Sequence, residues 1–222
     1  KSGVSAPVNI MGSNGGTMTI KKAREFVVNT FLSGPVGGVN GAIRTAALAG
    51  QENIITFDMG GTSTDVALVS GLSPRISHAN QIDAYPLQIP QLDMHTIGAG
   101  GGSIIWVRPD GTMEVGPRSA GAVPGPACYQ RGGTEPTISD ANLLLGRLAT
   151  ERELSGGLVL SHFAAKEAFM QLGSLLDMGD YEPVRLADSV LRIAVAKMAG
   201  AVREVSVHRG FDPRDFTMMG FG

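Results

Sequence analysis

Along the chain, short apolar runs of strand length alternate with longer segments in which apolar residues recur at helical spacing. Apolar or β-branched runs predict strands at residues 8–11, 17–20, 53–57, 66–69, 92–97, 103–107 and 216–219. Apolar residues at helical spacing predict helices at residues 21–30, 34–49, 140–148, 162–176 and 183–208. Strands that alternate with helices in this way are typical of an α/β protein.

Polar residues and glycines mark where these helices should begin and end. Ser33, Ser139 and Ser161 each precede a helical stripe, and a serine hydroxyl there can accept a bond from a free backbone N–H. Gly50 and Gly210 follow helical stripes and suit the left-handed residue that ends a helix. The sequence therefore predicts three N-caps and two C-terminal stops.

Two further patterns lie in the middle of the chain. Asp110-Gly111 predicts a tight turn that pairs residues 104–107 with residues 112–115 as a hairpin. Residues 116–137 carry so many glycines and prolines that we expect a long irregular loop, of the kind that is functional or disordered.

Composition narrows the class of protein. The chain has 222 residues and 43% hydrophobic residues, enough for a substantial core. A net charge of −2 without a basic stripe argues against nucleic acid as a partner. The single cysteine, Cys128, excludes an intrachain disulfide, fits a reducing compartment, and is expected to be a packed thiol. No apolar run approaches the roughly 18 residues of a membrane span, so we expect a cytoplasmic protein.

The predicted helix over 34–49 has one face made of small residues: Gly37, Gly38, Gly41, Ala42 and Ala46. Each glycine inside a helix costs roughly 1 kcal/mol against alanine. Something should therefore approach this face closely. Tight packing against another element would explain it, and so would a ligand or a hinge.

The stretch IITFDMGGTSTDVALV, residues 54–69, places a polar turn between two apolar runs. Glycines let backbone N–H groups approach phosphate oxygens, and short hydroxyls can bond them. A carboxylate can hold Mg²⁺, generally through water. The turn supplies all of these groups: Asp58, Gly60, Gly61, Thr62, Ser63, Thr64 and Asp65. A hairpin with a polar tip and a phosphate-binding loop are both compatible with this string.

A second glycine cluster, residues 98–102, separates two predicted strands. It could be a flexible turn, or it could let a ligand lie against bare backbone. Ser103 and His95 flank the cluster. A single histidine beside a loop is more often a structural hydrogen bonder than a base, and we expect that role for His95.

Longer blocks carry a family resemblance. The chain contains, in order, SGPVGGVNGA, FDMGGTSTDV, HTIGAGGGSI, VGPRSAGAVPGPACYQRGG, PTISDANLLLGRL and RGFDPRDF. Over residues 33–222 these blocks resemble the hydantoinase A, 5-oxoprolinase and acetone carboxylase β-subunit family. Val36, Val123 and Gln130 depart from the family pattern, and none of them lies in the turn after Asp58.

The order of parts resembles the actin, sugar-kinase and heat-shock-chaperone ATPase fold, which is ribonuclease-H-like. The resemblance implies an α/β ATPase lobe, with a mixed sheet and flanking helices, over residues 33–222. Residues 1–32 would be a strand and helix segment that could form the tail of a preceding lobe. We expect a fragment of a larger protein, because the family's first lobe carries its own D-x-G-G-T string and no second such string occurs here. We also expect the fragment to be truncated at the adenosine turn, because the chain stops where that turn should continue.

The resemblance also implies roles for particular residues, with ATP and Mg²⁺ as cofactors. Asp58 and Asp65 would be catalytic, and Asp58 would hold the Mg²⁺. The expected nucleotide-binding residues are Gly60, Gly61, Thr62 and Ser63 for the phosphates, Gly100, Gly101, Gly102 and Ser103 along the cleft, and Gly220 and Gly222 at the adenosine turn.

The implied activity is ATP-dependent opening of a cyclic amide or imide, such as a hydantoin, N-methylhydantoin or 5-oxoproline. Two alternatives stay open: a subunit of an ATP-dependent ketone (acetone or acetophenone) carboxylase, and a non-catalytic ATP-binding module. The implied partners are the small-molecule substrate and a subunit or fused domain of the hydantoinase B type. We expect this fragment by itself to bind ATP weakly without turnover.

Overall fold

The computed structural model describes residues 3, 6–78, 80–82, 85–150, 153–154, 156–179 and 181–222. Residues 1, 2, 4 and 5 of the predicted segment 1–32 lie outside the described residues. The chain divides into two compact units. Unit 1 comprises residues 1–58, 65–95 and 203–221, and unit 2 comprises residues 59–64, 96–202 and 222. Each unit has a hydrophobic core of its own.

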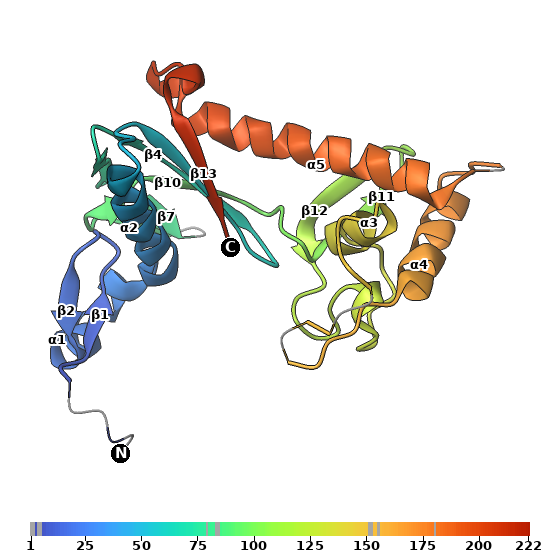
Figure 1. Ribbon diagram of the computed structural model, residues 1–222, viewed down its shortest axis with the longest axis horizontal. Helices are drawn as coiled ribbons and strands as arrows, with labels where there is room; N and C mark the ends of the chain where they lie inside the picture. Colours follow the sequence, from blue (N-terminus) through green and yellow to red (C-terminus); the bar gives the residue numbers. More distant parts are fainter. Residues whose placement is uncertain are drawn as a thin grey trace. The chain divides into compact units, whose positions relative to one another are not determined.

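The main sheet belongs mostly to unit 1, and its strand order is β10-β4-β3-β13, with β5 paired to β4 (Figure 1). The strands are β3 (Ile54–Met59), β4 (Thr64–Ser70), β5 (Ser73–Pro74), β10 (Met94–Ile97) and β13 (Thr217–Phe221). β13 runs parallel to β3 and β5 runs antiparallel to β4, so the sheet is mixed. The predicted α/β fold with a mixed sheet and flanking helices is confirmed.

Helix α2 (Ser33–Leu48) packs on this sheet through one apolar stripe. Val36, Val39, Ala42 and Ala46 recur at helical spacing and form a buried cluster with β3 and β4 residues such as Ile54. The other elements of unit 1 are β1 (Asn9–Met11), β2 (Thr17–Thr19), α1 (Ile20–Glu25), η1 (Val27–Thr30), β6 (Ile76–Ser77), β7 (Asn80–Ile82), β8 (Tyr85–Leu87), β9 (Gln91–Leu92), η3 (Val207–Arg209) and η4 (Pro213–Asp215).

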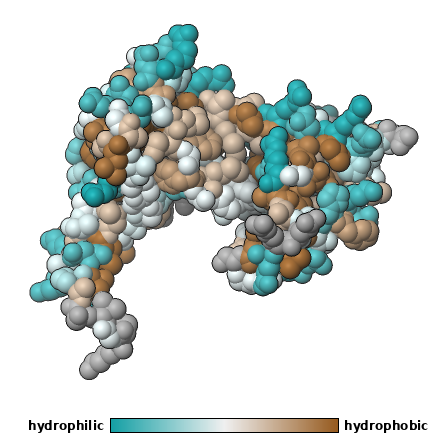
Figure 2. Space-filling view, in the orientation of Figure 1, coloured by the Kyte–Doolittle hydropathy of each residue, from teal (hydrophilic) through white to brown (hydrophobic). Residues whose placement is uncertain are grey.

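Some apolar side chains of unit 1 remain at the surface of its N-terminal part. Val27 is 66% exposed and Phe31 is 58% exposed, on the segment that follows α1. Figure 2 shows hydrophobic surface interspersed with hydrophilic surface over this part of the chain. The apolar residues Phe26 and Val27 of the helix predicted over 21–30 are therefore exposed, and neither α1 nor η1 contains a buried residue.

Unit 2 packs three helices around a hairpin. Its elements are β11 (Ser103–Val107), β12 (Met113–Ser119), η2 (Ala127–Tyr129), α3 (Ile138–Leu144), α4 (His162–Leu175) and α5 (Pro183–Val205), of which residues 203–205 are assigned to unit 1. β11 and β12 are antiparallel, with Trp106 opposite Glu114 and Val107 opposite Met113. The hairpin predicted at Asp110-Gly111 is confirmed.

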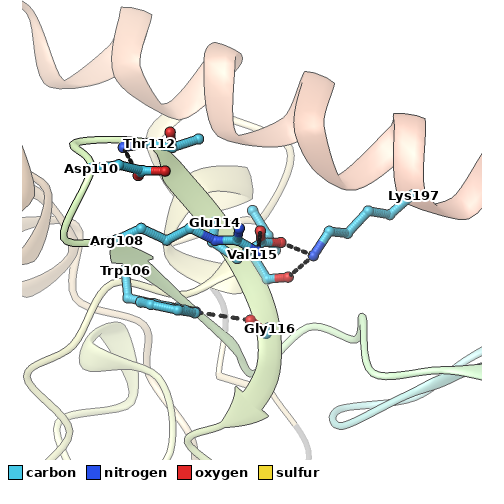
Figure 3. Close-up of polar contacts among 8 residues, drawn as sticks. All are labelled: Trp106, Arg108, Asp110, Thr112, Glu114, Val115, Gly116 and Lys197. Carbon is cyan, nitrogen blue, oxygen red and sulfur yellow. Dashed lines mark hydrogen bonds and ion pairs between the residues drawn. The ribbon is translucent and has the colours of Figure 1, made fainter.

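An ion cluster joins α5 to the hairpin (Figure 3). The ammonium group of Lys197 in α5 bonds the Glu114 carboxylate and donates to the Val115 carbonyl oxygen at 2.6 Å. Arg108 lies 2.8 Å from the other oxygen of Glu114. These two cations hold the pKa of Glu114 below its ordinary value, with the Lys197 hydrogen bond as the largest cause.

Two predicted helix starts are wrong. α2 begins at Ser33 itself, and its N-cap is Leu32, which makes no side-chain cap bond. α3 begins at Ile138, and its N-cap is Thr137 in a capping box with Asp140. Ser139 therefore lies inside the helix that it was expected to cap. The N-cap at Ser161 is confirmed, because its hydroxyl accepts from the Ala164 N–H at 3.1 Å.

The helix predicted over 21–30 divides into α1 and the short 3₁₀ turn η1, with Phe26 in a non-helical conformation between them. The helix predicted to 208 likewise ends at Val205 and continues as η3. Gly50 and Gly210 both have left-handed backbones just after a helix, at φ +68° and +81°, which confirms the two glycine stops.

The loop over 116–137 is more ordered than predicted. β12 continues to Ser119, and η2 forms a further turn. The carboxylate of Asp140 is fully buried and accepts bonds from the N–H groups of Cys128 at 2.7 Å and Thr137 at 2.9 Å. It also accepts from the Ala127 N–H and the Thr137 hydroxyl. One side chain of α3 therefore fastens the loop, an interaction between sequence-distant groups that glycine and proline content cannot reveal.

Within the described part of the chain, no helix combines the length and the apolar character needed to cross a membrane.

Candidate nucleotide-binding site

The turn that follows β3 is tight and presents its tip to solvent. The Gly60 N–H donates to the Ser63 carbonyl oxygen at 3.0 Å, which closes the turn. Gly61 and Thr62 are exposed at the tip, and Ser63 is half-buried. Two glycines, two hydroxyls and their backbone N–H groups are thus gathered at one surface point of unit 2. Such a group of donors suits a phosphate.

A second glycine segment lies directly against this turn. The Gly101 N–H donates to the Gly60 carbonyl oxygen at 3.0 Å, and the Gly102 N–H donates to the Gly61 carbonyl oxygen at 2.6 Å. The Thr64 hydroxyl donates to the Ala99 carbonyl oxygen at 2.5 Å. Two backbone stretches far apart in sequence therefore lie side by side.

The glycines of the second segment are required by this contact. A Cβ at Gly100 would lie 2.7 Å from the Gly60 oxygen and from the Thr62 and Ser63 nitrogens. A Cβ at Gly102 would lie 2.9 Å from the Gly61 oxygen. These neighbours are backbone atoms that cannot turn away. Bare backbone is needed here for another backbone segment, an explanation that the sequence did not suggest.

Ser103 fastens the second glycine segment from below. Its hydroxyl oxygen is fully buried and accepts from the Gly100 N–H at 2.8 Å. The Ser139 N–H, in the first turn of α3, donates to the Gly101 carbonyl oxygen at 2.7 Å. Gly100, Gly102 and Ser103 are all buried. The segment expected to line a cleft therefore lies behind the turn as its support.

Two carboxylates of the predicted site lie in unit 1. Asp58 is the fifth residue of β3 and is half-buried, and Asp65 is in β4. Partial burial raises the pKa of Asp58 above its ordinary value, and the charge of Asp65 raises it further. A cation between them would relieve this repulsion.

The donor set fits Mg²⁺ held chiefly by water and phosphate. Among the described residues, no group of three or more histidine, cysteine, aspartate or glutamate side chains could hold a metal. Mg²⁺ usually keeps several waters and uses one or two carboxylates together with substrate phosphates. Asp58 and Asp65 supply that number of carboxylates.

The remaining predicted residues are placed as follows. Gly220 is exposed in β13, paired in register with Phe57, and Gly222 has φ +124°, a conformation that favours glycine. His95 is half-buried in β10. Cys128 is fully buried, and burial followed by the nearby Asp140 raises its pKa. The prediction of a packed thiol is confirmed.

Sequence reasoning missed Phe221. This residue is the register partner of Asp58 across β13 and β3. Its ring fills the space that a side chain on Gly38 of α2 would occupy. Two features of the sequence could have indicated it: Phe221 lies between Gly220 and Gly222, and Gly38 lies inside a predicted helix.

The fold and the turn together define an α/β protein with a mixed sheet and a hydroxyl- and glycine-rich turn, supported from behind by a second glycine segment. Residues 1–222 match the family model described as hydantoinase/oxoprolinase, so the chain belongs to that family. The resemblance found in the six sequence blocks is thereby confirmed.

Several known proteins resemble the chain along nearly its whole length. It is 39% identical over 220 residues to caprolactamase subunit alpha of Pseudomonas jessenii, which covers 99% of this chain and 31% of the relative. The structure of an ATP-dependent acetone carboxylase without nucleotide aligns with TM-score 0.88 and 30% identity, over 99% of this chain and 31% of that one. The structure of the ATP-dependent caprolactamase from Pseudomonas jessenii aligns with TM-score 0.84 and 38% identity, over 99% and 32%. The chain thus spans about a third of the length of these relatives.

Proposed function

We propose that the full-length protein uses ATP to open a cyclic amide or imide, and that this chain supplies part of its nucleotide-binding site. The observation that carries the proposal is the turn at residues 60–63, whose exposed tip of glycines and hydroxyls is fixed from behind by two backbone hydrogen bonds. A rigid set of donors binds developing phosphate charge without having to reorganise.

Within this proposal, the N–H groups and hydroxyls of Gly60, Gly61, Thr62 and Ser63 bind the terminal phosphates of ATP. Asp58 holds Mg²⁺ through its water shell, and Asp65 holds the cation or orients water. Gly220 and Gly222 begin the turn that receives the adenosine. Gly100, Gly101, Gly102 and Ser103 act as the support of the phosphate turn.

The chemistry follows from how unreactive an amide carbonyl is. The amide oxygen attacks the γ-phosphorus, and ADP leaves with the electron pair of the broken P–O bond. Water then adds to the activated carbon, and the tetrahedral intermediate expels the ring nitrogen, which takes up a proton, leaving an acyl phosphate. A second water hydrolyses the acyl phosphate to the carboxylate and inorganic phosphate. Phosphoryl transfer depends mostly on positioning and charge neutralisation, which a fixed turn and paired carboxylates can supply.

Ketone carboxylation is the second candidate, and the high TM-score to the acetone carboxylase favours it. The higher sequence identity to the caprolactamase favours ring opening. In both activities the turn at residues 60–63 would bind the terminal phosphates of ATP. A subunit of the hydantoinase B type is the proposed partner in either case.

The test uses the full-length protein together with its partner subunit. It would be incubated with Mg·ATP and, separately, 5-oxoproline, caprolactam, hydantoin, or acetone with bicarbonate. Ring opening predicts phosphate release in step with ring-opened product and no need for bicarbonate. Bicarbonate-dependent turnover of the ketone would replace the proposal by the second candidate. Binding of Mg·ATP without substrate-stimulated hydrolysis would indicate a non-catalytic module.

A further inference from the structure

Gly38 lies within helix α2, and another residue occupies the space that a side chain at this position would fill. An ideal Cβ at Gly38 would lie 2.6 Å from Cε2 and 3.2 Å from Cζ of the Phe221 ring. Both are shorter than ordinary van der Waals contact, so a methyl at residue 38 would force the ring or the helix to move. The costly glycine in α2 therefore has a specific occupant from β13.

The carboxylate of Asp58 borders the same space. Its Oδ2 atom would be 3.5 Å from the Cβ at Gly38. Phe221 is opposite Asp58 in the parallel pairing of β13 with β3, and such partners project on the same face of a sheet. Phe221 also packs against the buried cluster that α2 forms with the sheet. The ring therefore packs against the core of unit 1, and the carboxylate lies beside the same space at Gly38.

We infer that Gly38 and Phe221 are positioning residues for Asp58. The Phe221 ring occupies the space beside Gly38, and together with the bare helix surface at Gly38 it restricts the direction in which the Asp58 carboxylate points. This inference rests on the proposed function, because it assigns the direction of Asp58 a purpose in holding the Mg²⁺ shell. Neither residue touches the reacting atoms.

The chain provides a matched control on the same helix. Gly41 also lies within α2, but a Cβ there would meet no atom within 4 Å. Gly38→Ala and Gly41→Ala add the same methyl group and improve helix propensity equally. The methyl at residue 38 would meet Phe221 and Asp58, whereas the methyl at residue 41 would meet no atom within 4 Å, so helix effects cancel in the comparison.

The experiment measures ATP turnover and Mg·ATP binding in the full-length protein with its partner subunit. We expect Gly38→Ala to lower kcat about tenfold or more while the KM for ATP changes less than about threefold, because misaligned catalytic groups cost rate more than binding. Phe221→Leu should lower kcat in the same direction. The double variant Gly38→Ala/Phe221→Leu should have a higher kcat than Gly38→Ala alone, because the shorter leucine side chain leaves room for the methyl group. Gly41→Ala should stay within about twofold of the wild type.

Three outcomes would overturn the inference. The first is that Gly38→Ala has the same kcat as Gly41→Ala. The second is that Gly38→Ala raises the KM for ATP and leaves kcat unchanged. The third is that adding Phe221→Leu to Gly38→Ala does not restore kcat. Each would mean that Phe221 does not set the position of Asp58.

Thermal denaturation tests the positioning role without nucleotide. If the wild type binds no Mg·ATP, that result refutes the proposed function, and the positioning role is then tested by Tm. The Tm change caused by Gly38→Ala should differ between the wild-type and Asp58→Asn backgrounds, because the methyl borders the carboxylate. Additive Tm changes would refute the positioning role without any nucleotide.

Discussion

The Gly102 N–H donates a 2.6 Å hydrogen bond to the Gly61 carbonyl oxygen, so one glycine segment holds another in place. The exposed turn at residues 60–63 thus has a rigid partner beneath it. In the proposed phosphate-binding role, N–H groups that are fixed before the anion arrives avoid an ordering cost that would weaken affinity.

Gly100→Ala should therefore disrupt the turn. The added methyl would lie 2.7 Å from three backbone atoms of the turn, and relief requires the turn to move. We expect a loss of about 1–3 kcal/mol of stability, as for other overpacked sites, and a loss of about tenfold or more in Mg·ATP affinity. Thermal denaturation and isothermal titration of the full-length protein would measure these changes. Gly200→Ala in α5, where a Cβ meets nothing within 4 Å, is the control and should bind Mg·ATP as the wild type does.

Asp58→Ala in the full-length protein should abolish ATP turnover and leave the fold intact. The pKa of Asp58 is raised, so its charged form is disfavoured in the native state above the ordinary aspartate pKa. Removing that charge should not destabilise the protein at neutral pH, and circular dichroism should be unchanged. Asp65→Asn is the comparison, and it should retain more turnover than Asp58→Ala. Turnover that survives Asp58→Ala would show that another residue holds the metal.

Lys197→Met should destabilise unit 2 at neutral pH. Lys197 bonds Glu114 and Val115 of β12, and Glu114 would keep only Arg108 as a cation among the partners described (Figure 3). The Lys197 side chain is more than a third exposed, so solvent screening limits the loss to about 1–2 kcal/mol. Thermal denaturation against pH would measure it.

The pH dependence of that loss has a definite sign. The lowered pKa of Glu114 means that its ionised form stabilises the native state above the ordinary glutamate pKa, and this stability disappears as the pH falls through the folded-state pKa. The gap between wild type and Lys197→Met should therefore narrow at acidic pH. Arg192→Met, which removes an exposed pair with Asp188 on the same helix, should change stability by less than about 0.5 kcal/mol at any pH. A gap that is independent of pH would argue for lost packing alone.

Asp140→Asn should loosen the loop that η2 and α3 share. The buried carboxylate accepts from four donors, and an amide NH₂ in its place would face some of those N–H groups. We expect a loss of about 2–4 kcal/mol. Cys128, whose N–H bonds Asp140, is fully buried, so its labelling by a thiol reagent should accelerate in the variant. Asp188→Asn on exposed α5 surface should leave the labelling rate unchanged.

Local patterns predicted much of the secondary structure because they act within a few residues. The hairpin at Asp110-Gly111, the N-cap at Ser161 and the stop at Gly210 all follow from turn or cap chemistry. The start of α3 was missed by two residues, because Thr137 and Asp140 form a capping box in which Asp140 also bonds a distant loop.

By itself the sequence determined the α/β class, the family and the polar turn after Asp58, since residue types and their order carry that information. Only the tertiary structure decided what the glycines are for. Gly100 and Gly102 accommodate the backbone of the turn, and Gly38 accommodates the ring of Phe221. A glycine records that something approaches closely, but it has no side chain to indicate what that neighbour is, and only the folded chain brings the neighbour there.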